Sequence, residues 1–222
     1  GILFSDSAKI FDGGVPHLKS ARFAYEGCSF AGYQLRFVTE DACIGGCWKE
    51  LDVIVIPETP AVRDETFEAL TQFTEGGGTA IRVGTPIPYT ERGMSRYDVL
   101  RNTGNTVLVR GMNLPTEYLH AMDAAITAGA LPPVPRAVNT SGYPIEGVRT
   151  QFVHYEGAPY LYLVNLRKTT VNCELAGMLQ SGRDLIRGRE VSFPRMVEPL
   201  DPMLVRLDTT AHETMLSAAT KK

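Results

Sequence analysis

The sequence has few of the residues that carry metal or redox chemistry, and it has no long apolar run. Its 222 residues include four cysteines, and its four histidines are scattered rather than grouped as a ligand set: His17, His120, His154 and His212. We therefore expect no metal and no cofactor. No run approaches the roughly 18 apolar residues that cross a bilayer, so no membrane partner is expected. A net charge of −3 provides no basic face for nucleic acid.

The chain also lacks an initiator methionine and a charged-then-apolar leader. It opens on Gly1 and enters the apolar run "ILF" at once. We expect a piece of a longer polypeptide, and a cytoplasmic protein in preference to a secreted one.

The cysteines are too few for a disulfide scaffold. Cys28 falls on the apolar face of an expected helix and Cys173 in an expected strand, and both are interpreted as core residues. Cys43 and Cys47 in "CIGGCW" are closer together. Two ordinary thiols are the favoured interpretation, and a local redox pair or a metal site is the alternative.

Residues 1–130 alternate strands with helices, which predicts an α/β domain with a flavodoxin-like, doubly wound parallel sheet. "LDVIVI" is apolar almost throughout, as expected of a parallel strand covered on both faces. The helix that follows has a stripe of Phe67, Leu70 and Phe73 and ends in three glycines. We predict the strand order 2-1-3-4-5. The expected strands are 2–4, 34–38, 51–56, 79–83 and 105–109.

A segment rich in proline and small polar residues, 129–144, is expected to be a linker or an extended crossing. Beyond it, helical periodicity is absent and short alternating runs are separated by turn residues. Residues 145–210 are therefore predicted to form a small antiparallel β-sandwich of six or so strands.

The carboxyl ends of the strands lack the expected nucleophile and phosphate-binding loop. The first loop, "SDSAKIFDGGVPH", contains neither a dinucleotide fingerprint nor a P-loop. After the fourth strand the sequence is "IRVGTPIP", so Gly84 and Thr85 stand where an amidotransferase has its cysteine elbow. The scaffold resembles a class I glutamine amidotransferase without its thiol.

The stretch "LDVIVIPETPAVRDETFEALTQFTEGGGTAIRVG" resembles the amidotransferase-like trimerisation domain of family 42 β-galactosidases and related glycoside hydrolases. The second half, with "YLYLVNL", "DLIRGREV" and "VEPLDPMLVRLD", is similar to the C-terminal β-sandwich domain of that family. The resemblance implies a homotrimer, and a catalytic (β/α)₈ barrel in the same polypeptide upstream of Gly1. It implies that this part of the chain takes part in carbohydrate metabolism without being catalytic alone.

Acidic residues follow the first three strands and are expected on one rim of the sheet: Asp6, Glu40, Asp41 and Glu58. Paired carboxylates can hydrolyse glycosides, but a solvated rim or a contact with the barrel or an oligomer partner is the stronger interpretation. Trp48, the only tryptophan, is expected in the core, with an interface or sugar-facing role as the alternative.

Three tyrosines, Tyr155, Tyr160 and Tyr162, lie on expected strands, and the last two share a face. Core packing is favoured over a carbohydrate platform. The leading hypothesis is an accessory, oligomerising region of a glycoside hydrolase. A carbohydrate-binding module and a divergent amidotransferase-like enzyme using Thr85 are the alternatives.

Overall fold

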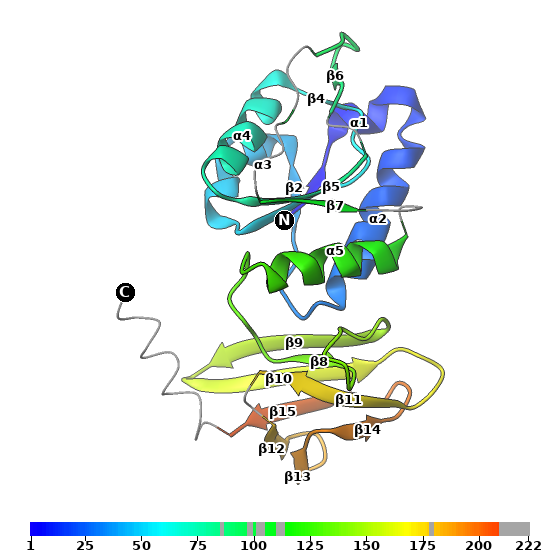
Figure 1. The fold of residues 1–222 in the computed structure, drawn as a ribbon, viewed down its shortest axis with the longest axis vertical. Helices are drawn as coiled ribbons and strands as arrows, with labels where there is room; N and C mark the ends of the chain where they lie inside the picture. The colour runs from blue at the N-terminus through cyan, green and yellow to red at the C-terminus, as the bar shows by residue number, and fades with distance from the viewer. Residues whose placement is uncertain (85–86, 97–99, 101–104, 110–113, 178–179, 209–222) are drawn as a thin grey trace. The chain divides into compact units, whose positions relative to one another are not determined.

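The computed structural model describes residues 1–222 apart from 85–86, 97–99, 101–104, 110–113, 178–179 and 209–222 (Figure 1). The chain divides into two compact units. The first contains Gly1–Cys28 and Leu35–Pro132, and the second contains Ser29–Gln34 and Pro133–Lys222. These boundaries differ from the expected 1–130 and 145–210, because a six-residue segment from the first half belongs to the second unit. None of the described helices combines the length and the apolar character that a membrane crossing requires.

The first unit is built on a five-stranded parallel sheet. Its order is β2-β1-β3-β5-β7, and every neighbouring pair is parallel. Counted along the chain, this is the predicted order 2-1-3-4-5, which is confirmed. The central strands are also the most buried, since β3 has no exposed residue. The strands are β1 (Ile2–Phe4), β2 (Phe37–Thr39), β3 (Val53–Ile56), β5 (Thr79–Val83) and β7 (Thr106–Val109).

Helices cover both faces of this sheet. On one face, the buried stripe Phe67, Leu70 and Phe73 of α4 (Asp64–Glu75) joins a core cluster with Leu3 and Ile54. On the other, α2 (Val15–Ser29) and α5 (Pro115–Thr127) meet where the hydroxyls of Ser20 and Tyr118 lie 2.6 Å apart. Four short helices complete the unit: α1 (Asp6–Ile10), η1 (Phe11–Gly13), α3 (Glu40–Ile44) and η2 (Cys47–Glu50).

Sequence periodicity missed one small element of this unit. The strands β4 (Ala61–Val62) and β6 (Tyr89–Thr90) form a two-stranded parallel ribbon. Two residues are too few to show an alternating pattern, so this ribbon could not be predicted from the sequence.

The second unit has two antiparallel sheets. One has the order β13-β12-β15-β10-β9 and the other β14-β11-β8. They share one core, to which the first sheet contributes Leu161 and Val205 and the second contributes Cys173 and Leu175. The strands are β8 (Arg136–Val138), β9 (Val148–Tyr155), β10 (Ala158–Asn165), β11 (Val171–Ala176), β12 (Ser181–Asp184), β13 (Arg189–Ser192), β14 (Arg195–Val197) and β15 (Met203–Leu207).

The segment interpreted as a linker is partly a strand. β8 lies within 129–144 and pairs with β11. With β14, which was not expected either, the described residues of this unit contain eight strands, against the six or so that were expected. The sequence did not predict β8, because prolines precede it and the strand has only three residues. The segment Ser29–Gln34 packs on the same region: a Cβ at Gly32 would lie 2.8 Å from the Cβ of Arg136.

A tight hairpin fixes the register of the longest strand pair. Glu156 and Gly157 connect β9 to β10, and both have left-handed φ angles, 49° and 75°. Two such residues make the turn that matches the natural twist of a hairpin. The turn places Tyr155 opposite Ala158, and consequently Val153 opposite Tyr160 and Gln151 opposite Tyr162.

Candidate functional site

The carboxyl ends of β1, β2 and β3 bring a set of polar side chains together, at the edge where ligands of such sheets usually bind. Ser5 follows β1 and is the N-cap of α1, since its hydroxyl accepts a hydrogen bond from Ala8 N–H. Glu40 follows β2 and begins α3, and Glu58 comes shortly after β3. His17, from α2, reaches the same place.

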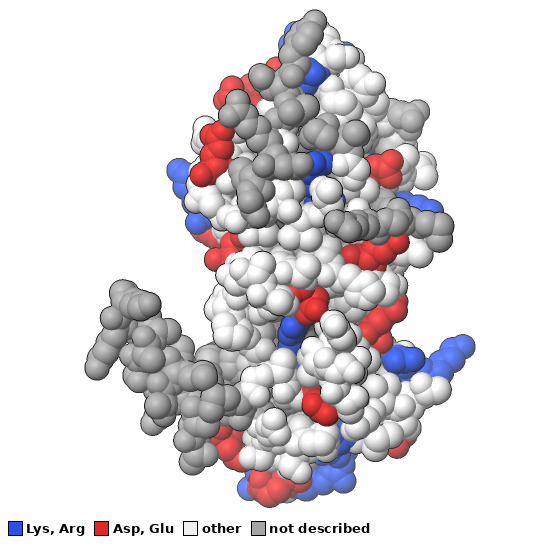
Figure 2. All heavy atoms as spheres, in the orientation of Figure 1, with Lys and Arg blue, Asp and Glu red and all other residues white. Residues whose placement is uncertain are grey.

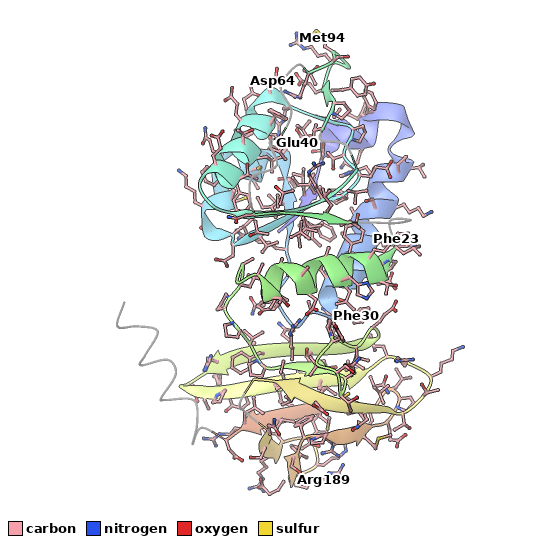
Figure 3. The ribbon with its side chains drawn as sticks, in the orientation of Figure 1. Phe23, Phe30, Glu40, Asp64, Met94 and Arg189 are labelled. Carbon is pink, nitrogen blue, oxygen red and sulfur yellow. The ribbon has the colours of Figure 1, made fainter. Side chains whose placement is uncertain are left out.

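Glu40 is the centre of this cluster, and it is buried. Figure 3 shows it inside the first unit, near α1 and β4, and its relative exposure is 0%. Oε1 accepts hydrogen bonds from the Ser5 hydroxyl and the Ser7 N–H, both at 2.8 Å. Oε2 accepts from the Arg63 N–H at 2.8 Å and the Thr66 hydroxyl at 3.1 Å. The Arg63 guanidinium adds an ion pair at 3.5 Å.

These donors determine the charge of the carboxyl group. Burial by itself raises the pKa of Glu40, but the hydrogen bonds from Arg63, Ser7 and Ser5 outweigh it and lower the pKa to about 2. Glu40 is therefore ionised at neutral pH and has no proton to donate. A general acid of a glycosidase needs the opposite shift. Glu40 was expected on a solvated rim of the sheet, and the structure differs, because the side chain is buried. Its carboxylate holds three segments of the chain together.

The tautomer of His17 follows from its two partners. The Ser5 N–H donates to Nε2 at 3.0 Å, so that nitrogen carries no proton. Nδ1 lies 3.0 Å from the Glu58 carbonyl oxygen, so it carries the proton and donates. Burial lowers the pKa of His17, opposed by the hydrogen bond to Glu58. The neutral imidazole therefore has a structural role, since it links β1, α2 and the loop after β3.

The other acidic residues predicted on the rim, Asp6, Asp41 and Glu58, have exposed side chains, unlike Glu40. Asp6 forms an ion pair with Lys9, one turn along α1. Asp41 accepts a hydrogen bond at 2.6 Å from Arg63, which joins it to the surface side of Glu40. The side chain of Glu58 is exposed, while its backbone is used by His17 and Ser20.

Trp48 and the neighbouring cysteines belong largely to the core. Trp48 is partly buried in η2 and packs on the cluster that contains Leu70 and Phe73, with Lys49 Nζ 5.6 Å from its ring centre. Cys43 is buried and Cys47 is partly buried, and neither forms a disulfide. Burial raises the pKa of Cys43 to about 12 and also raises that of Cys47, so both are protonated thiols. The described residues contain no cluster suited to a metal ion.

The elbow after β5 holds a left-handed glycine. Gly84 has φ +61°, and its carbonyl accepts a hydrogen bond from the buried Arg82. The candidate nucleophile Thr85 lies outside the described residues. By sequence, no cysteine occurs between Val83 and Ile87.

Sequence reasoning missed a set of apolar residues near the same edge, three of them exposed, which we call the α1–β6 patch and define as Ile10, Phe11, Val15, Tyr89 and Met94. Ile10 is 84% exposed, Val15 68% and Met94 58%. Phe11 stacks on Tyr89 with ring centres 5.1 Å apart. Met94 lies at the tip of the first unit in Figure 3. The available signal was the run "KIFDGGVP", where apolar residues flank a glycine pair outside any helical stripe.

A hollow of 370 Å³ lies at the opposite edge, where β3, β5 and β7 begin. Backbone and small side chains line much of it, including Gly77, Gly78, Ala128 and Gly129, with Asp52 and Asn105 as its longer polar groups. The face drawn in Figure 2 has basic and acidic side chains interspersed, without a continuous basic stripe among the described residues.

Neither a family model nor a curated protein matches the chain. Solved structures do. An exo-carrageenase of family GH42 from Bacteroides ovatus matches 93% of this chain with 20% identity and a TM-score of 0.70. A β-galactosidase from Rahnella sp. R3 matches 93% with 13% identity and a TM-score of 0.65, and a catalytic mutant of the GH42 β-galactosidase Gan42B from G. stearothermophilus matches 93% with 12% identity and a TM-score of 0.63. The chain spans 29% to 40% of the length of these proteins. The likeness shows a shared fold of both units.

Proposed function

We propose that the chain is an accessory region of a glycoside hydrolase similar to the family 42 β-galactosidases, whose catalytic barrel is another part of the same polypeptide. The first unit would be a flavodoxin-like, class I amidotransferase-like domain that has lost its chemistry, and the second the family's C-terminal β-sandwich. One observation carries this proposal: 93% of the chain, across both units, follows a 29–40% portion of GH42 chains.

The cluster around Glu40 supports a non-catalytic role. Glycoside hydrolysis needs two carboxyl groups placed across one glycosidic bond, one of them protonated. Glu40 is ionised, buried and occupied by four hydrogen-bond donors. Asp6 and Asp41 are exposed and already in ion pairs.

The proposed role is to position the barrel and to mediate self-association, with a trimer implied by the resemblance. The α1–β6 patch supports it, because exposed apolar residues that gather around an aromatic stack are typical of protein interfaces. Trp48, the anchor expected from the sequence, is less suitable because it packs partly on the core. The ion pair and the buried hydrogen bonds of Glu40 would hold α1 in place, which lowers the entropic cost of association through the patch.

Light scattering after size-exclusion chromatography tests this role. We expect the chain to associate at micromolar concentration, and Val15→Glu to shift it at least tenfold toward monomer, because the substitution buries a charge in the interface. Leu185→Glu is the matched control, since Leu185 is exposed in the second unit. A monodisperse monomer at high micromolar concentration would remove the association proposal. Hydrolysis of a nitrophenyl galactoside by the purified chain would overturn the non-catalytic one.

A further inference from the structure

The outer face of the five-stranded sheet in the second unit carries tyrosines and arginines in register. Residues opposite one another on paired strands point to the same face of a sheet. In one row, Val153, Tyr160, Arg206, Arg183 and Glu190 follow one another across the strands from β9 to β13. In the next row, Gln151, Tyr162 and Leu204 are neighbours.

The two tyrosines point away from the core. Leu161 and Leu163, which alternate with them on β10, are 0% exposed and lie in the shared core. Tyr162 is 38% exposed and Tyr160 is partly exposed. Residues two apart on a strand are separated by about 6.8 Å. The two tyrosines therefore lie next to one another on the outer face, at a spacing comparable to the size of a sugar ring, and aromatic side chains contact sugars through C–H groups.

The arginines beside them are a like-charged pair. Arg206 stands directly opposite Arg183, an arrangement that destabilises a sheet unless an anion compensates it. Glu190 lies opposite Arg183 on its other side, and Arg183 reaches the Gly188 carbonyl oxygen at 3.5 Å. Within the part of the chain that the structure describes, the guanidinium of Arg206 makes no hydrogen bond or ion pair, while its backbone pairs with β10 and β12. A fork of donors is thus available next to Tyr160.

We propose that this face binds an acidic polysaccharide, with sugar rings on Tyr160 and Tyr162 and a sulfate or carboxylate group on Arg206 and Arg183. The tyrosines alone would suit a neutral sugar, and the arginines alone would suit any anion. Their adjacency selects a chain of sugars that carries negative groups. Nucleic acid is disfavoured because the protein as a whole is acidic, with a net charge of −3. This site does not depend on the proposed accessory role or on association.

Isothermal titration of the full chain at low and physiological salt tests the proposal, using oligosaccharides of a sulfated galactan, of polygalacturonate and of a neutral galactan, and a DNA oligonucleotide. We expect at least one acidic saccharide to bind at least tenfold more tightly than the neutral one and the DNA. Arg206→Gln should weaken that binding about tenfold or more, because a hydrogen-bonded charge is lost. Tyr162→Ser should weaken it at both salt concentrations, since stacking is not screened.

Matched controls separate this face from the rest of the protein. Arg92→Gln removes an exposed arginine from the first unit, and Tyr143→Ser removes a tyrosine that is 62% exposed in the loop before β9. Neither should change the affinity by more than about twofold. Circular dichroism melts confirm that each variant is folded. Equal affinity for neutral and acidic saccharides, preference for DNA, or no binding at all would overturn the proposal, and so would unchanged affinity in both Arg206→Gln and Tyr162→Ser.

Discussion

Replacing Glu40 with glutamine should destabilise the first unit far more than an acidic residue at the start of a helix usually would, because Glu40 is buried. The amide keeps one acceptor oxygen but turns an NH₂ group toward two donors. Either the Ser7 N–H and Ser5 hydroxyl or the Arg63 N–H and Thr66 hydroxyl then lose their acceptor. Leaving a buried donor unpaired costs about 1–3 kcal/mol, so Glu40→Gln should lower the free energy of unfolding by about 3–5 kcal/mol.

The pKa leads to a similar magnitude. A carboxyl group with a pKa of about 2 in the folded state and 4.5 when unfolded stabilises the fold by about 3 kcal/mol at neutral pH. Because the folded pKa is the lower one, this stabilisation is complete above the unfolded value of 4.5. It is lost as the pH falls through 4.5 toward 2. Glu40→Gln should therefore flatten the pH dependence of stability in that window.

Urea unfolding followed by tryptophan fluorescence is a suitable assay, since the single tryptophan, Trp48, reports on the first unit. Asp41→Asn is the matched control. It neighbours Glu40 and bonds the same arginine, but it is exposed, so its loss should cost no more than about 0.5 kcal/mol. A Glu40→Gln variant within 1 kcal/mol of the wild-type protein, with an unchanged urea slope, would refute the reasoning.

Three further outcomes follow from the first unit. The pKa of His17 in the folded state lies below 6.5, so the unfolded state binds the proton first as the pH falls. Stability should therefore decrease as the pH drops below 6.5. The urea midpoint of His17→Gln should not show this pH dependence. Cys43 should react with iodoacetamide at pH 7.5 at least tenfold more slowly than the more accessible Cys47, as peptide mass spectrometry can follow; fast labelling of Cys43 would reopen the redox interpretation. Gly27→Ala should cost about 2 kcal/mol or more in thermal unfolding, since a Cβ there would overlap the Pro115 carbonyl of α5.

The parallel sheet was predictable because its signals are long and redundant. "LDVIVI" and the stripe of α4 each repeat one period over several residues, and together they placed β3 at the centre. The strands that the sequence did not reveal are β4, β6, β8 and β14, which have two or three residues each. At that length, pairing depends on neighbours far away in the chain, which local periodicity does not contain.

The polar cluster was only half predictable. Sequence placed Asp6, Glu40 and Glu58 after three strands, and parallel order brings such positions to one edge. It could not show that Glu40 turns inward, because an acidic residue at a helix start is usually solvated and its donors come from Ser5, Ser7 and Arg63, on two other segments. The α1–β6 patch was overlooked for a similar reason, since exposure is decided by packing.

The segment Ser29–Gln34 has a consequence for dissecting and recombining this protein. The polypeptide passes between the two units three times, after Cys28, after Gln34 and after Pro132. A gene fragment that ends at residue 132 would carry six residues whose neighbours it has deleted, including Gly32 without Arg136. A fragment that begins at residue 133 would lack residues 29–34, which belong to the second unit. Neither unit is therefore encoded by one continuous stretch of the gene, and a dissected or recombined version has to keep residues 29–34 together with residues 133–208.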